Sequence, residues 1–232
     1  MSEVASKAMQ AGMARGFAVA FSVMVAVALL ITTASATLAA TAPPAPVIVS
    51  PPEGSYDNDG AFKLSGTAPT NSVVKVFDTV SGREYYQGTA EVDSAGKWAL
   101  PLSGVADGKH AYQARVTDLA SSRVSSWSNT RTVIVDTKAP AAPYLAPYFS
   151  GGNAYGTAEP NSKVEVFMTH EKTTSLGTVQ ADGQGNWSKE IFNSMGDDGT
   201  YWFKARATDP AGNVSGWSDE RMTSIINGWI TN

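Results

Sequence analysis

The sequence predicts an all-β protein in which two tandem antiparallel β-sandwiches follow an N-terminal hydrophobic helix. Three observations lead to this fold class. Four short motifs occur twice, in the same order and about 90 residues apart. Apolar residues alternate strictly with polar ones in several segments, as they do in a strand with one buried face. The 21 glycines and 12 prolines are spread between short apolar runs, where they mark turns.

The first element is an uncharged apolar segment at residues 17–31, which predicts a helix. Two basic residues precede it, and a run of small residues that contains Ala34-Ser35-Ala36 follows it. A positive start, an apolar middle and an A-x-A site are the parts of an export signal, so residues 1–40 are expected to be a signal peptide. An uncleaved anchor is the alternative, with membrane contact through residues 17–40, since about 20 apolar residues cross a bilayer. Either alternative places the rest of the chain outside the cytoplasm, secreted or at the cell surface.

After a proline-rich spacer at residues 41–46, one unit is written twice, at residues 47–137 and 138–232. The matching segments, first copy before second, are GTAPTNSVVKVF from Gly66 and GTAEPNSKVEVF from Gly156, DSAGKW from Asp93 and DGQGNW from Asp182, YQARVTD from Tyr112 and FKARATD from Phe203, and VSSW ending at Trp127 and VSGW ending at Trp217. We therefore expect two domains of the same fold. Pro140 and Pro143 restrict the backbone and lack N–H donors, so the joint between the domains is expected to be stiff.

Alternation is clearest in the segment YWFKARAT of the second copy. The residues expected to face the core are Tyr201, Phe203, Ala205 and Ala207, and those expected to face solvent include Trp202, Lys204 and Arg206. The first copy repeats the pattern, with Tyr112, Ala114 and Val116 facing inward. A sheet with one buried and one wet face is the expected result. Cross-strand charge pairs would account for the outward arginines, Arg115 and Arg206.

These motifs together resemble the bacterial Ig-like domains that occur in tandem in surface adhesins and biofilm-associated proteins. The residues that carry the resemblance are the joint DTKAPAAP, the segment GTAEPNSKVEVF, the turn DGQGNW and the ending TDPAGNVSGWS. The resemblance covers about residues 45–225 and implies an immunoglobulin-like sandwich for each copy. It also implies a non-enzymatic module, since such domains serve as spacers, stalks and binding heads.

Composition excludes several classes of function. The net charge is −4, the pI is about 5.2 and no run of Lys or Arg occurs, which excludes a nucleic-acid binder because such a protein needs a basic face. The chain has no cysteine, so disulfides, thiol catalysis and zinc fingers are excluded as well. Neither His110 nor His170 lies in a catalytic or metal-binding spacing, and His110 falls on the inward register as a packing residue.

Aromatic residues are the first candidates for contact with a partner. The tryptophans that recur in both copies, Trp98, Trp127, Trp187 and Trp217, are expected to be core anchors. Aromatics present in one copy only are better candidates for a ligand or partner contact: Tyr85, Tyr86, Trp202 and Trp229. An exposed aromatic completes a protein–protein contact or stacks on a sugar.

Three aspartates are candidates for calcium, although no cofactor is required. Asp118 and Asp209 end the repeated TD motif, and Asp136 lies at the joint. The resemblance implies that acidic residues near domain joints can bind calcium, which takes six to eight oxygen ligands. The alternative is a turn in which Asp accepts backbone N–H bonds, Pro fixes φ and Gly allows φ above zero.

The function expected from these observations is an exported interaction or adhesion module, a short stiff rod that presents loops to a protein or cell-surface glycan. One alternative is a structural subunit whose retained N-terminal helix embeds in a membrane complex or filament, with the sandwiches outside. The other is a carbohydrate-binding module. Both alternatives remain open at the level of the sequence, as does assembly into a larger surface structure.

Overall fold

The computed structural model describes residues 41–149, 152–227 and 229–231. The signal peptide or anchor expected at residues 1–40 lies outside the described residues. No helix in the described ranges is long and apolar enough to span a membrane. The all-β prediction is confirmed: apart from one three-residue 3-10 turn, η1 (Phe192–Ser194), the elements of the described chain are strands.

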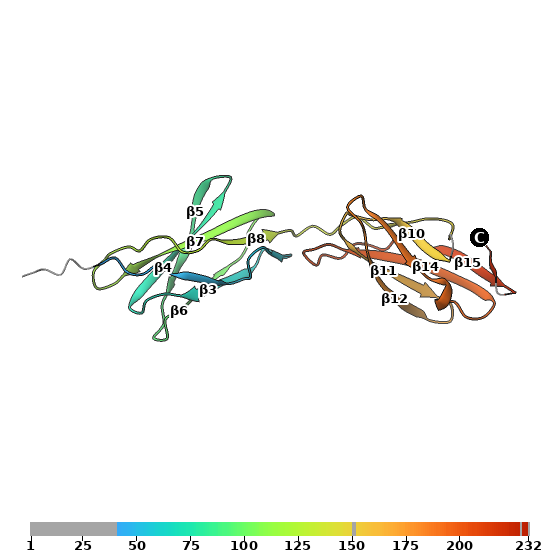
Figure 1. Ribbon diagram of the computed structural model, residues 1–232, viewed down its shortest axis with the longest axis horizontal. Helices are drawn as coiled ribbons and strands as arrows, with labels where there is room; N and C mark the ends of the chain where they lie inside the picture. Colours follow the sequence, from blue (N-terminus) through green and yellow to red (C-terminus); the bar gives the residue numbers. More distant parts are fainter. Residues whose placement is uncertain (1–40, 150–151, 228, 232) are drawn as a thin grey trace, which may run out of the picture. The chain divides into compact units, whose positions relative to one another are not determined.

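The first domain pairs its strands into two sheets (Figure 1). Its strands are β1 (Val47–Ser50), β2 (Ser55–Asp57), β3 (Phe62–Thr67), β4 (Ser72–Val80), β5 (Arg83–Glu91), β6 (Lys97–Leu102), β7 (Gly108–Asp118) and β8 (Arg131–Val135). The smaller sheet has the order β1-β3-β6 and the larger one β2-β8-β7-β4-β5. Neighbouring strands in both sheets are antiparallel except β2 and β8, which pair in parallel.

The second domain repeats this plan. Its strands are β9 (Tyr144–Leu145), β10 (Asn153–Thr157), β11 (Lys163–Thr169), β12 (Thr173–Gln180), β13 (Asn186–Glu190), β14 (Gly199–Thr208), β15 (Arg221–Ile226) and β16 (Trp229–Thr231). The sheets have the orders β13-β10-β9 and β12-β11-β14-β15-β16. Both domains therefore consist of a three-stranded sheet and a five-stranded sheet.

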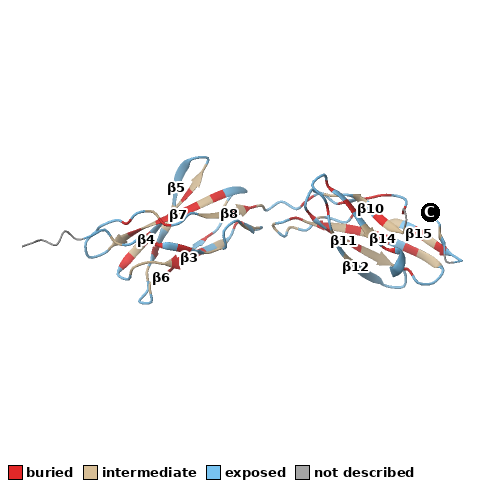
Figure 2. Cartoon of the chain, viewed as in Figure 1, coloured by how far each residue is buried: buried red, intermediate tan, exposed pale blue. Residues whose placement is uncertain are grey.

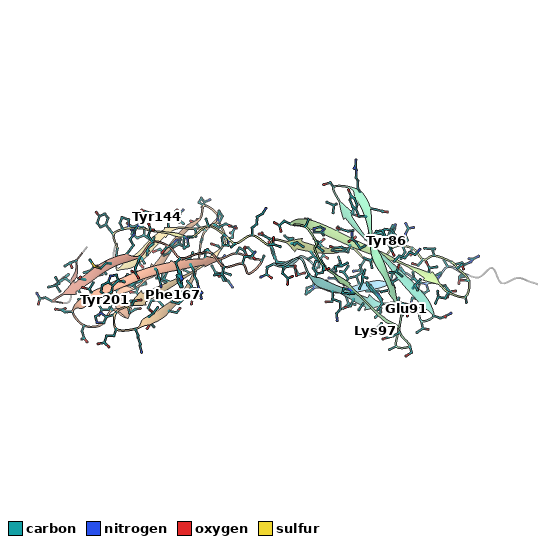
Figure 3. The ribbon with its side chains drawn as sticks, turned by 180° about the vertical axis from the view of Figure 1, so that it is seen from behind. Tyr86, Glu91, Lys97, Tyr144, Phe167 and Tyr201 are labelled. Atoms are coloured by element: carbon teal, nitrogen blue, oxygen red, sulfur yellow. The ribbon has the colours of Figure 1, made fainter. Side chains whose placement is uncertain are left out.

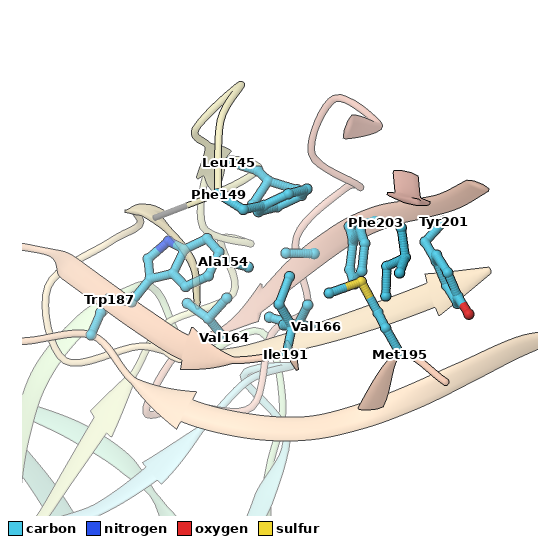
Figure 4. Close-up of a cluster of buried hydrophobic side chains, with 13 residues drawn as sticks. Leu145, Phe149, Ala154, Val164, Val166, Trp187, Ile191, Met195, Tyr201 and Phe203 are labelled. Carbon is cyan, nitrogen blue, oxygen red and sulfur yellow. The ribbon is translucent and has the colours of Figure 1, made fainter. Parts of the chain in front are cut away.

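Period-two burial builds a separate core in each domain (Figure 2). The residues expected to face inward on β14 and β7 are buried, so the predicted alternation is confirmed. Figure 4 shows the second core. Trp187 on β13 and Ile191, the residue after that strand, pack in one cluster with Val164, Val166 and Phe203 of the five-stranded sheet. Trp98 is 3% exposed and Trp187 is 4% exposed, which confirms that this pair of tryptophans anchors the cores.

The glycine that opens the GTA motif explains why the motif occurs twice. A Cβ atom on Gly66 would lie 1.8 Å from the carbonyl oxygen of Val47, and one on Gly156 would lie 1.9 Å from that of Tyr144. Each glycine thus lets the first strand of its domain approach the next strand closely.

The two domains differ at one edge of the five-stranded sheet. In the first domain, β2 pairs in parallel with β8, joining Tyr56 to Ile134. In the second domain, the matching stretch of β15 pairs with the C-terminal strand β16 in antiparallel fashion, joining Ile226 to Trp229. The final segment of the chain thus fills the place that β2 takes in the first domain.

Candidate functional site

The outward face of the first domain's five-stranded sheet carries a stack of aromatic rings beneath an arginine. The guanidinium carbon of Arg115 on β7 lies 3.6 Å from the centroid of the Trp127 ring. The Phe77 ring on β4 meets Trp127 edge-on at 5.4 Å and Tyr86 on β5 at 5.7 Å. The ring quadrupole attracts the cation, so the stack orders these side chains on a solvent-facing surface.

The second domain carries the same stack at matching positions. Phe167 on β11 meets Trp217 edge-on at 5.0 Å, and the Arg206 guanidinium lies 5.3 Å from the Trp217 ring. The ammonium of Lys204 lies 4.5 Å from that ring. Figure 3 labels Phe167 on the second domain and Tyr86 on the first.

An ion pair joins the second stack. Arg206 donates two hydrogen bonds to Glu165, which is its direct neighbour across β11 and β14. Burial raises the pKa of the Glu165 carboxyl, but hydrogen bonds from Ser175 and Arg206 and the charge of Arg206 outweigh it, so the pKa is lowered. Charge pairing therefore accounts for Arg206, as expected. Arg115 instead faces Lys75 across β4 and β7, so its ring contact takes the place of the expected charge pair.

Two serines position each outward tryptophan. In the first domain, the hydroxyls of Ser125 and Ser128 accept hydrogen bonds from the backbone N–H groups of Val116 and Ala114. The backbone N–H groups of the same serines donate to the carbonyls of Val116 and Ala114. Two serines three residues apart thus provide hydrogen-bond partners for the backbone N–H and C=O groups of β7 that do not pair with β8. Trp127, between the serines, is turned toward the arginine.

The second copy uses the same device. Ser215 and Ser218 accept from the N–H groups of Ala207 and Ala205 on β14, and donate their own backbone N–H groups to the carbonyls of those residues. The motif S-x-W-S thus occurs once in each domain. It takes the place of a neighbouring strand beside β7 in the first domain and beside β14 in the second.

The expectation that Trp127 and Trp217 are core anchors is wrong. Trp217 is 45% exposed and Trp127 is partly exposed, because the serine-bonded segment lies at the sheet edge and directs its tryptophan to the outer face. Sequence periodicity could not place these residues, since the segment is not a strand. The spacing of the two serines around each tryptophan is the signal that could have placed them.

The predicted contact residues of the first domain lie on one strand but face opposite ways. Tyr86 belongs to the outward stack and bonds through its hydroxyl to that of Thr89. Tyr85 lines a groove of 690 Å³ whose wall also includes Val80, Asp107 and His110. Both tyrosines are exposed, and the structure does not bring them into one site.

The predicted contact residues of the second domain share one face. Trp202 on β14 is 38% exposed and Trp229 on β16 is 77% exposed. Trp202 pairs with Met222 on β15, and Trp229 pairs with Ile226 of the same strand. The placement of Trp202 on the outward register is as expected.

The three aspartates considered for calcium each hold their own turn. Asp118 accepts from Ala120 and Ser121, and the side-chain hydrogen bond from Ser121 is the main cause that lowers the pKa of its carboxyl. The Asp209 carboxylate accepts from Gly212 and Asn213. That of Asp136 accepts from the N–H of Lys138. In the described part of the chain, no three acidic or histidine side chains gather as metal ligands.

His110 is buried as expected, but in a hydrogen-bonded pair with Asp78. Its Nδ1 lies 2.6 Å from the Asp78 carboxylate and its Nε2 lies 2.8 Å from the carbonyl oxygen of Ala106. Asp78 also accepts from the N–H of Ala111. Asp78 continues the inward register of Val74 and Val76 on β4, a local signal that predicts its burial but not its partner. The pair ties the loop before β7 to β4.

The other histidine packs at the end of the second domain. The His170 ring stacks on Tyr201 at 4.5 Å, and its Nδ1 lies 2.9 Å from the carbonyl oxygen of Thr200.

A family model of the bacterial Ig-like domain matches residues 54–137 and 147–223. No curated protein matches the chain.

The chain is also similar, at low sequence identity, to several solved structures. A tetra-tandem repeat from the extending region of a large adhesion protein shares 22% identity, with a TM-score of 0.34, over 72% of this chain and 46% of that one. The BSP domain of a biofilm-associated protein shares 17% identity, with a TM-score of 0.30, over 77% of this chain and 29% of that one. Domains FN1–FN3 of chicken CNTN1 share 14% identity, with a TM-score of 0.47, over 79% of this chain and 66% of that one.

The chain spans less than half the length of the first two of these structures. Its own two sandwiches match one family model twice, in the order in which the motifs repeat. The chain belongs to the bacterial Ig-like domain family and carries two copies of that domain.

Proposed function

We propose that the chain is an exported, non-enzymatic adhesion module that contacts its partner through the outward faces of its five-stranded sheets. The observation that carries this proposal is the duplicated stack of arginine, tryptophan and phenylalanine. In both domains it occupies the solvent-facing side of the larger sheet, while a separate core closes the inner side. Aromatic side chains and arginine are enriched at protein interfaces and among the residues that dominate binding energy. Aromatic rings bury a large area with few rotatable bonds.

Two sequence features support the rest of the proposal. The apolar leader expected within residues 1–40 supports a location at the cell surface or outside the cell. Pro140 and Pro143 support a stiff joint, so that the two domains act as a short rod. Distance measurements between spin labels in the two domains test the joint. The proposal expects one narrow distribution that broadens when both prolines are replaced by glycine.

Adhesion is tested with a fragment of residues 42–232, which contains both closed cores. Beads coated with this fragment should attach to bacterial cells grown as a biofilm, whereas uncoated beads should not. A variant with Arg115, Trp127, Arg206 and Trp217 replaced by alanine should lose most of the attachment and keep the β-sheet circular dichroism spectrum. Equal attachment by coated and uncoated beads would refute the proposal.

A further inference from the structure

The outward face of the second domain carries a group of exposed apolar side chains. Trp202, Met222, Ile226 and Trp229 lie on the three adjacent strands β14, β15 and β16, and all are exposed. We call these residues the C-terminal face. At the positions in the first domain that match the first three, Ala111, Thr132 and Asp136 are found. The duplicated framework therefore presents a different surface in each copy.

Hydroxyl groups surround Trp202 on the same face. Its neighbour across the strand pair on β11 is Thr169, whose hydroxyl lies 2.9 Å from that of Thr173. The outward residue before it on β14 is Thr200, whose hydroxyl lies 3.2 Å from that of Ser224. An indole ring among hydroxyls offers both a stacking surface and hydrogen-bonding groups.

The charge of this sheet face is opposite to that of the protein. Its outward charged residues are Lys163, Glu165, Lys204 and Arg206, a net charge of +2 on a chain whose net charge is −4. Glu165 is held by Arg206, and Lys204 forms no ion pair within the described residues. The other carboxylates of this domain lie in its loops or on β13. The face is therefore complementary to an anionic partner.

We infer that the C-terminal face binds an acidic polysaccharide with uronate carboxylates, a deepening of the proposed adhesive function on which this inference rests. Trp202 stacks on the apolar face of one sugar ring, and Lys204 pairs with the carboxylate of the next sugar unit in the polymer. The two side chains point outward from one strand two residues apart, about 6–7 Å, because a strand rises about 3.3 Å per residue. The hydroxyls around Trp202 favour a polyhydroxylated polymer over an acidic peptide.

Calorimetric titration of the 42–232 fragment with polygalacturonate tests the inference. The matched control ligand is the same polymer with its carboxylates reduced to alcohols, which keeps the sugar rings and removes the charge. We expect binding of polygalacturonate that weakens as salt is added, because salt screens exposed charges. The reduced polymer should bind at least several-fold more weakly.

Variants locate the site. Trp202→Ala should weaken polygalacturonate binding about 5- to 10-fold, the effect expected from loss of an aromatic contact of about 1 kcal/mol or more. Lys204→Gln should weaken it about 3-fold and flatten its salt dependence. The control variants are Lys109→Gln and Gln113→Ala, which change outward residues on β7 of the first domain. Gln113 is the match of Lys204, and both variants should leave binding unchanged.

Several results would overturn the inference. No calorimetric binding of polygalacturonate, equal binding by the Trp202→Ala variant, or equally tight binding of polyglutamate would each do so. The bead assay separates this failure from that of the proposed function. Beads that attach to cells without any affinity for polygalacturonate would refute the acidic glycan and leave adhesion standing.

Discussion

The two domains share one framework but differ in the side chain that holds one of their loops. The loop lies just before β7 in the first domain and just before β14 in the second. In the first domain, His110 binds the Ala106 carbonyl and is held by Asp78. In the second, Tyr201 takes the place of His110, and its hydroxyl donates to the Asp197 carbonyl at 2.8 Å. A histidine hydrogen-bonded to an aspartate and a tyrosine hydroxyl thus hold equivalent loops. Backbone requirements are therefore the same in both copies, whereas side chains that only need to reach one carbonyl oxygen differ between them.

The largest effect should come from the shared glycines. Gly66→Ala and Gly156→Ala each place a methyl group less than 2 Å from a carbonyl oxygen of the neighbouring first strand, so that strand must move away. We expect each variant to lose about 3 kcal/mol or more of unfolding free energy in its own domain. Urea titration followed by NMR signals of each domain checks this. A loss of unfolding free energy from only one of the two substitutions would show that the two glycines are not equivalent.

A smaller loss of unfolding free energy should occur in the first domain only. Asp78→Ala leaves the buried His110 without its carboxylate and the Ala111 N–H without an acceptor, and should cost the first domain about 2–4 kcal/mol. The double variant Asp78→Met and His110→Tyr installs the residues found at Met168 and Tyr201, and should recover most of the loss. A double variant no more stable than Asp78→Ala would show that the two tethers are not interchangeable.

Serine substitutions should again act alike in both domains. Ser125→Ala and Ser215→Ala each remove the acceptor of one strand N–H, that of Val116 or Ala207, and should cost about 1–2 kcal/mol. Exchange of these two amide protons with solvent should become faster. Ser126→Ala, which changes a residue between the bonded serines, is the control and should have little effect.

How far the sequence predicted this structure depends on whether a residue belongs to a strand. Phe203, Trp187 and Trp202 were placed correctly because burial in a strand repeats every two residues, a local rule. Trp127 and Trp217 were misplaced because side-chain hydroxyls, not strand pairing, fix their segment.

Pairings between distant elements also escaped the sequence analysis. The contact of Asp78 with His110 depends on which inward residues of β4 and β7 lie near each other. The choice between β2 and β16 as the edge strand depends on which segment reaches the free side of β8 or β15. Neither follows from a local pattern, since both arise from the alignment of residues far apart in the chain.

Low pH should slightly reduce the unfolding free energy that Glu165 contributes to the second domain. The pKa of Glu165 is lowered in the folded state, so its contribution is present above the ordinary value of 4.5 and is lost as the pH falls through and below it. Because the pair with Arg206 is partly exposed, the loss should be about 0.5–1 kcal/mol in the second domain. The matching residue of the first domain is Lys75. Glu165→Gln should remove this part of the pH dependence in a urea titration at pH 3 to 6.

Calcium removal should have no effect on either domain. The carboxylates of Asp118 and Asp209 already accept hydrogen bonds from their own turns. The melting temperature of the 42–232 fragment should be the same with a chelator and with added calcium. A higher melting temperature with calcium would show that an ion binds the folded state.

The central claim is that one sandwich is written twice, with one pair of tryptophans in the cores and the other on the outer faces. A crystal structure of the 42–232 fragment tests it most directly. The account predicts two separate cores around Trp98 and Trp187, with Trp127 beneath Arg115 and Trp217 beside Arg206 on the solvent side. A single merged core, or Trp127 and Trp217 buried between the sheets, would contradict it.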